Sequence, residues 1–229
     1  GLRQTFYFLK EEGLVDQDYS FVFSLPLPKK HRVRKPIPHE EIAAILGSID
    51  QSTPQGKRDY AMILTGVVTG LRSVDIRELK FENIDWINGE IRISQTKTGK
   101  ALALPLTKDV GEAVKNYILD GRPDSSSEYI FLRTYAPHPK LTTSAINNVF
   151  NQYRLALGLP RCGFHDLRRA LGTSLVTTGT SVTTVAQVLG HRNLESTKQY
   201  INLDVEHLRG VGLGLEGFMP KEEGDGDGI

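Results

Sequence analysis

The residues best suited to chemistry lie in a few short motifs, and the first is Thr-Gly-Leu-Arg at 69–72. It places Arg72 after an apolar stretch and a glycine, at the predicted start of a helix. Backbone N–H groups and a guanidinium together form a good anion-binding arrangement. Asp75 follows three residues later, on the same helix face, where it can orient Arg72. A surface ion pair explains the same spacing more simply.

The second motif, His-Asp-Leu-Arg-Arg at 165–169, places His165 and Arg168 on one face of a predicted helix. Neither side chain neutralises the other, so an anion between them would explain the pairing. A solvated helix face accounts for it equally well. Cys162 lies nearby, but no metal-ligand spacing connects it with the histidines, and we expect no metal.

The remaining motifs are a turn with Lys97, a Leu-Gly-His-Arg segment at 189–192 that contains His191, and Tyr200 nine residues further on. A lysine in a glycine-containing turn is usually only solvated. The turn lacks the spaced first glycine of a nucleotide-binding loop, which argues against nucleotide binding. A lone tyrosine in a short amphipathic segment is most often buried for packing.

The elements that must position these residues are mostly helical. Apolar spacing of three and four residues predicts helices at 2–12, 39–49, 58–68, 73–79, 108–120, 142–157, 165–178, 181–189, 194–201 and 204–210. Alternating apolar residues at 91–93 and 102–106, with an Asn-Gly turn at 88–89, predict a small antiparallel sheet of about three strands. The expected fold is therefore mainly α with a small antiparallel three-stranded β-sheet.

Composition is that of an ordinary globular protein, with 229 residues, 39% of them hydrophobic, and a net charge of +1. Such a balance alone argues against a nucleic-acid-binding protein. The charge is segregated, however: residues 29–35 hold five bases, and residues 221–229 hold four acids and one base. The single cysteine excludes an intrachain disulfide and favours a reducing compartment.

Taken together and in order, these motifs resemble the catalytic domain of the phage-integrase-type tyrosine recombinases, over about residues 39–210. The resemblance implies an enzyme that cleaves DNA by tyrosine attack, forms a 3′-phosphotyrosyl intermediate and rejoins strands, with no cofactor and no metal. Two arginines and a histidine would bind the phosphate, a lysine would be the general acid and a second histidine the general base. The implied catalytic residues are Arg72, Lys97, His165, Arg168, His191 and the nucleophile Tyr200, with Asp75 orienting Arg72.

The resemblance also implies an organisation. Residues 1–25 would be the remnant of an upstream core-binding domain, 26–38 a basic proline-rich linker, 39–220 the catalytic domain and 221–229 an acidic, glycine-rich disordered tail. We expect a double-stranded DNA recombination site as partner, a homotetramer on DNA that is monomeric when free, no membrane, and a cytoplasmic, nucleoid-associated location in a prokaryote. The expected contacts to the DNA backbone are Lys29, Lys30, Arg32, Arg34, Lys35, Arg92, Lys100 and Arg154.

Several functions remain open at this point. Integration or excision of a phage or other mobile element is expected over chromosome-dimer resolution, which uses the same chemistry. A type IB topoisomerase-like enzyme would relax supercoils with the same active site. A non-catalytic DNA-binding relic would have lost a nucleophile or an arginine, and none is lost here. A metal hydrolase built on His165 and His191 would be inactive in EDTA.

Overall fold

The computed structural model describes residues 2–17, 35–96, 99 and 101–189. The chain divides into two compact units, residues 1–34 and 35–229. In the first unit, α1 spans Leu2–Glu11, close to the helix expected at 2–12. Among the described residues, no helix combines the length and the apolar character needed to cross a membrane.

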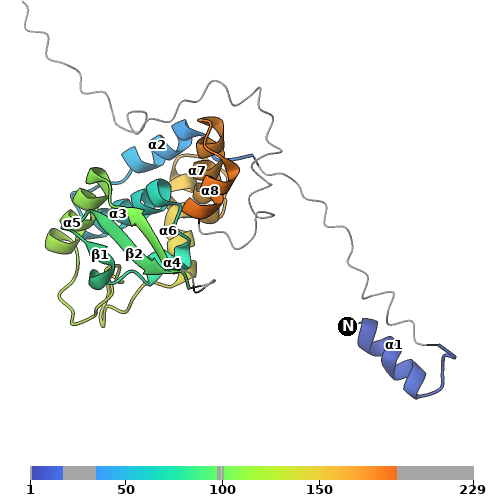
Figure 1. The fold of residues 1–229 in the computed structure, drawn as a ribbon. Helices are drawn as coiled ribbons and strands as arrows, with labels where there is room; N and C mark the ends of the chain where they lie inside the picture. Colours follow the sequence, from blue (N-terminus) through green and yellow to red (C-terminus); the bar gives the residue numbers. More distant parts are fainter. Residues whose placement is uncertain (1, 18–34, 97–98, 100, 190–229) are drawn as a thin grey trace, which may run out of the picture. The chain divides into compact units, whose positions relative to one another are not determined.

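The second unit is mostly helical, with one sheet of three strands in its described part (Figure 1). This confirms the predicted fold class. The helices are α2 (His39–Gly47), α3 (Pro54–Thr69), α4 (Ser73–Arg77), the 3-10 helix η2 (Phe81–Asn83), α5 (Lys108–Asp120), α6 (Thr143–Ala156), α7 (His165–Thr177) and α8 (Val182–Val188). The helices predicted at 194–201 and 204–210 lie outside the described residues.

Helix α3 is the centre of this unit and contacts α2, α4, α5, α6 and α7. Its middle turn, residues 61–64, is buried throughout, as expected for a helix surrounded by others. It begins four residues before the predicted start because Pro54 occupies the first turn and Thr53 Oγ1 accepts the Gly56 N–H at 3.0 Å. It ends at Gly70, whose φ of +63° favours glycine.

The sheet follows the order β1 (Ile84–Asp85), β2 (Glu90–Ser94), β3 (Ala101–Pro105), and both pairings are antiparallel. Ile91 pairs with Leu104, and Ser94 pairs with Ala101 where β2 ends and β3 begins. The inward side chains of all three strands belong to the same hydrophobic core as α3. Strand β1 has two residues, too few for an alternating pattern, so the sequence indicated it only through the Asn-Gly turn at 88–89 that follows it.

Helices α7 and α8 lie side by side in Figure 1. Val185 and Leu189 form a second, smaller apolar cluster with Leu171 and Leu175 of α7. The start of α7 also packs closely against α3: a Cβ atom at Gly66 of α3 would lie only 2.5 Å from the ring of Phe164. A glycine at position 66 therefore lets the residue that precedes His165 come close to α3.

The last residues of the predicted linker belong structurally to the second unit. Ile37 is buried in the main core, and Lys35 beside it is exposed. The segment predicted as a basic proline-rich linker therefore ends in residues that include one member of the main core, and burial stabilises an isoleucine at that position. Residues 26–34 lie outside the described part.

Candidate active site

Arg72 lies at the start of α4, in extended backbone geometry, directly after the turn that ends α3. Its Nη1 is 3.7 Å from Asp75 Oδ2, and the two residues stand three apart as the sequence suggested. The Arg72 side chain keeps 17% of its surface exposed, whereas that of Asp75 keeps 1%. The pair therefore combines a fixed, buried carboxylate with a guanidinium that solvent still reaches.

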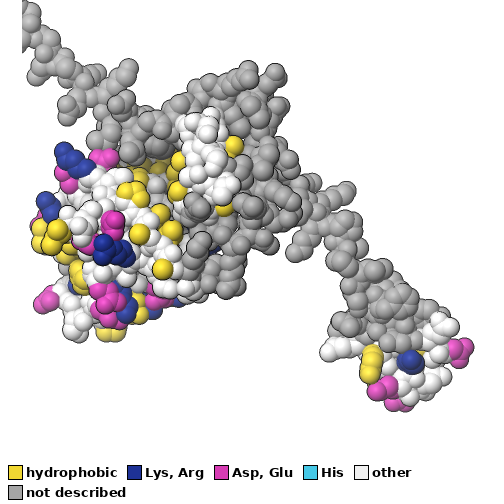
Figure 2. Space-filling model, viewed as in Figure 1, with side chains coloured by type: hydrophobic (Ala, Val, Ile, Leu, Met, Phe, Trp, Pro, Cys, Tyr) yellow, Lys and Arg dark blue, Asp and Glu magenta, His cyan; other side chains and the backbone are white. Residues whose placement is uncertain are grey.

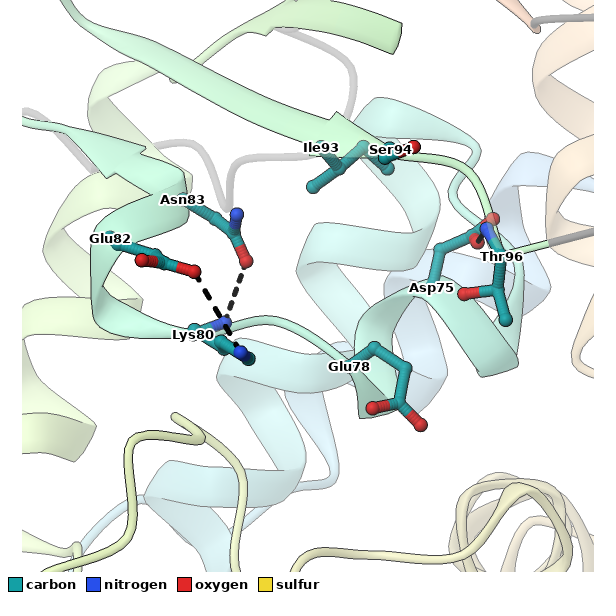
Figure 3. A pocket seen from close by; sticks show the side chains of 8 residues that line it. All are labelled: Asp75, Glu78, Lys80, Glu82, Asn83, Ile93, Ser94 and Thr96. Atoms are coloured by element: carbon teal, nitrogen blue, oxygen red, sulfur yellow. Dashed lines mark hydrogen bonds and ion pairs between the residues drawn. The ribbon is translucent and has the colours of Figure 1, made fainter. Parts of the chain in front are cut away.

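Asp75 also reaches the end of β2, since its Oδ1 accepts the backbone N–H of Thr96 at 3.0 Å. Figure 3 shows Asp75 and Thr96 side by side at one end of a small cavity. The two oxygens of one buried carboxylate thus face Arg72 and the strand that leads to Lys97. A buried carboxylate without such donors would be costly, so these contacts stabilise Asp75 in its buried position.

Arg168 is 1% exposed and is held by backbone carbonyls. Its Nη1 donates to the Gly70 oxygen at 2.9 Å, and its Nη2 donates to the Leu189 oxygen. These acceptors lie 98 and 21 residues away in the chain. Arg168 therefore joins the end of α3 to the residue after α8, which excludes a solvated helix face at this position.

His165 is the first residue of α7 and retains solvent access. Its pKa is lowered, first by partial burial of the ring and then by the positive charges of Arg168, Arg169 and, more weakly, Arg72. Asp166 acts in the opposite direction. Arg72 and Arg168 therefore lie close enough to influence His165 electrostatically. Their positive charges favour the neutral form of its imidazole, which can accept a proton.

The segment before α7 is fixed by two asparagines of α6 that sequence reasoning missed. Asn151 Nδ2 donates to the Cys162 oxygen at 2.8 Å, and Asn151 Oδ1 accepts the Cys162 N–H at 3.0 Å. Asn147 Oδ1 accepts the Phe164 N–H at 2.9 Å. The only signal in the sequence is that these two amides stand four apart, on one helix face.

Three of the six expected catalytic residues lie in the described part of the chain, and the structure brings Arg72, His165 and Arg168 into one region. Lys97, His191 and Tyr200 lie outside the described residues. Among the described residues, no group of three or more His, Cys, Asp or Glu side chains could hold a metal ion.

The expected DNA contacts differ in their surroundings. Lys35 is exposed, and Arg92 is exposed but paired with Asp85 at 3.2 Å and Glu90 at 2.8 Å. Arg154 is buried: its Nη2 lies 3.0 Å from Glu41, and its Nε donates to the Pro160 oxygen at 2.9 Å. We therefore leave Arg154 out of the proposed DNA contacts, because its charge is already matched inside the protein. Lys29, Lys30, Arg32, Arg34 and Lys100 lie outside the described residues.

Charge on the face shown in Figure 2 is mixed, with basic and acidic side chains interspersed among the described residues. The cavity in Figure 3 has a volume of about 170 Å³. Its lining includes the acidic side chains of Asp75, Glu78 and Glu82, with Lys80 paired to Glu82 at 3.8 Å. Carboxylates repel a phosphate, so this cavity is a poor candidate for the anion-binding site.

Comparison with known proteins places these features in context. The model of the phage integrase family matches residues 35–207. The putative integrase/recombinase y4gC of Sinorhizobium fredii is 38% identical over 181 residues, which covers 78% of this chain and 94% of that protein. The tyrosine recombinase XerC of Oceanobacillus iheyensis is 31% identical and is matched over 91% of this chain and 69% of its own length.

The chain spans 44% of a second putative integrase/recombinase of S. fredii, y4rA, to which it is 35% identical over 79% of this chain. Among solved structures, the site-specific recombinase XerH bound to palindromic difH substrate, a post-cleavage complex, aligns with a TM-score of 0.68. The identity is 23%, and the alignment covers 80% of this chain and 54% of that one. At that identity the likeness concerns the fold.

Proposed function

Because this chain belongs to the phage integrase family, we propose that it cleaves and rejoins DNA strands at specific sites, with Tyr200 as the nucleophile. The observation that carries the proposal is the meeting of Arg72, His165 and Arg168 from two distant parts of the chain. A histidine with a lowered pKa beside two guanidinium groups is suited to a reaction at a phosphodiester.

The proposed reaction is a pair of transesterifications. The Tyr200 oxygen attacks the scissile phosphorus and its proton passes to His165, while the bond from phosphorus to the 5′-oxygen breaks. Lys97 protonates the leaving 5′-oxygen as the general acid. The product is a 3′-phosphotyrosyl bond and a free 5′-hydroxyl, and attack by a new 5′-hydroxyl reverses the step and joins exchanged strands.

Arg72, Arg168 and His191 are assigned to the nonbridging oxygens of the phosphate. These oxygens gather negative charge in the transition state, where preorganised donors are worth most. Arg168 suits a fixed position because two backbone carbonyls hold its guanidinium. Arg72 suits direct contact because its side chain is partly exposed. Asp75 orients Arg72 from the buried side.

The proposed partner is a double-stranded DNA recombination site, on which copies of the chain assemble as a tetramer. Support comes from relatives named as integrases and recombinases and from the DNA-bound XerH structure. We propose integration or excision of a mobile element as the biological role, on the strength of the two S. fredii names. Chromosome-dimer resolution remains the alternative, favoured by the likeness to XerC.

A nicked DNA duplex tests the chemistry. With a nick a few nucleotides from the scissile phosphate, cleavage releases a short fragment that carries the free 5′-hydroxyl. This fragment diffuses away and cannot rejoin, so the covalent protein–DNA adduct accumulates. Wild-type protein should form the adduct, also in EDTA, and Tyr200→Phe should form none. Tyr135→Phe is the matched control, because Tyr135 is 56% exposed and its described ring contact is with Arg133. An adduct that persists in Tyr200→Phe would overturn the assignment of the nucleophile.

Strand exchange separates recombination from supercoil relaxation. A recombinase requires two matching sites and gives exchanged products, whereas a topoisomerase-like enzyme relaxes plasmids that lack the site. We expect exchanged products on paired sites and little relaxation of a plasmid without them. The reverse result would favour the topoisomerase-like alternative.

A further inference from the structure

Gln95 lies two residues before Lys97, at the start of the segment that the sequence predicts to be a turn, and is completely buried. Its backbone oxygen accepts the Gly99 N–H at 2.8 Å. Gly99 has a φ of +66°, a geometry that favours glycine in such a turn. This hydrogen bond joins two described residues on either side of Lys97.

The side chain of Gln95 connects this turn to the opposite side of the site. Its Nε2 lies 3.4 Å from the Leu189 oxygen, 94 residues away in the chain. The same oxygen accepts the Nη2 of Arg168. One backbone carbonyl therefore receives a donor from the hairpin and another from the arginine that we assign to the phosphate.

Thr96 provides a second attachment next to the first. Its N–H donates to Asp75 Oδ1 at 3.0 Å, and the other oxygen of Asp75 faces Arg72 at 3.7 Å. The two residues that directly precede Lys97 are consequently tied to both arginines of the site, each through one intermediary. A buried polar contact such as that of Gln95 is costly to leave unmade, and the partly buried bond of Thr96 favours the same arrangement.

Resting on the proposed function, we propose that Gln95 is a positioning residue for Lys97, which holds the base of the turn at a fixed place relative to Arg168. A lysine has a long, flexible stem, and its ammonium can protonate the leaving oxygen only from the correct distance. A misplacement of about 1 Å can cost on the order of 100-fold in rate. Gln95 removes this freedom at the start of the turn.

The test uses Gln95→Met and two nicked DNA substrates. Methionine has a length and volume similar to those of glutamine but no N–H, and Leu189 retains its bond from Arg168, so we expect the fold to persist. One substrate has the normal 5′-oxygen as leaving atom, and the other has sulfur there. A thiol has a pKa near 8.5, so the thiolate leaves without a proton and needs no general acid.

Gln95→Met should lower the rate of adduct formation on the oxygen substrate by about 10- to 100-fold and leave the rate on the sulfur substrate within about threefold of wild type. Lys97→Ala should show the same pattern with a larger loss. Gln152→Met is the matched control, because Gln152 is exposed on α6 and should react at the wild-type rate on both substrates.

Two results would overturn the proposal: an equal loss on both substrates, which would place the effect elsewhere in the site, or no loss on the oxygen substrate. The failure of the proposed function looks different. In that case wild-type protein forms no adduct on either substrate, or Lys97→Ala loses equally on both, whatever Gln95→Met does. Thermal unfolding of Gln95→Met within a few degrees of wild type shows that the comparison concerns folded protein.

Discussion

The two arginines of the candidate site differ in how the fold holds them. Arg72 lies in the turn between α3 and α4, keeps 17% of its side chain exposed and faces one carboxylate. Arg168 lies within α7, is 1% exposed and supports two backbone carbonyls from separate parts of the chain. Two arginines of one proposed phosphate site therefore differ in how much each contributes to the stability of the fold.

This difference in burial suggests that Arg72 serves mainly to bind the phosphate, whereas Arg168 also stabilises the fold. An exposed guanidinium can meet a phosphate with little rearrangement of the protein. A buried guanidinium that satisfies carbonyls also holds elements together, so its removal weakens the hydrogen bonding of those carbonyls and leaves empty space. The same substitution at the two positions should therefore affect activity similarly and stability differently.

Arg168→Ala should have the largest effect. We expect a loss of at least 10²-fold in adduct formation and a decrease of about 2–4 kcal/mol in the free energy of unfolding, because the Gly70 carbonyl loses its side-chain donor and the Leu189 carbonyl keeps only the long contact from Gln95. Urea unfolding and the nicked-substrate assay measure both quantities. Arg168→Lys keeps the charge and should recover part of the stability. An unchanged free energy of unfolding in Arg168→Ala would contradict the inference that this arginine stabilises the fold.

Arg72→Ala should lose about 10²–10³-fold in adduct formation, as is typical for the removal of one transition-state donor. Its free energy of unfolding should change by about 1 kcal/mol, since no backbone carbonyl among the described residues depends on Arg72 and Asp75 keeps the Thr96 N–H. DNA affinity, measured by fluorescence anisotropy, should weaken only in part. A stability loss as large as that of Arg168→Ala would remove the contrast between the two regions.

Arg169→Gln should have the smallest effect, seen in the pH dependence of adduct formation. Arg169 is one of the positive charges that lower the pKa of His165. Its removal raises that pKa toward the ordinary value, so the neutral, proton-accepting imidazole is lost at a higher pH. The acid limb of the profile should move to higher pH, with a maximal rate within about threefold of wild type.

Arg169→Lys keeps the charge and provides the control for this shift. Its acid limb should remain at the wild-type position. A shift of the Arg169→Gln profile to lower pH would contradict the assignment of His165 as general base. The size of the shift measures how strongly a charge on α7 other than Arg168 affects His165.

The sequence predicted the local parts of this molecule well. Periodic apolar residues located α3, α5, α6 and α7, and alternating apolar residues at 91–93 and 102–106 located the β2–β3 hairpin. The Arg72–Asp75 pair followed from a spacing of three on a helix. Each of these depends on interactions between residues close in the chain, which repeat with the period of the element.

Contacts between distant segments could not be predicted in this way. Arg154 looked like an exposed base, yet it pairs with Glu41 of α2. Gln95 gave no signal, because its partner lies 94 residues away. Asn147 and Asn151 resembled ordinary polar residues of an amphipathic helix until the loop before α7 was seen to bond to them.

By itself, the sequence determined the mainly helical fold with its small sheet, the family likeness and the types of side chain available for chemistry, because each is written in short motifs and local periodicity. Only the tertiary structure decided which arginine is buried, that the Leu189 carbonyl is shared by Arg168 and Gln95, and that Asp75 contacts both Arg72 and the Thr96 N–H just beyond β2. The physical reason is that burial and the satisfaction of polar groups depend on which distant segments meet, and packing around α3 settles this.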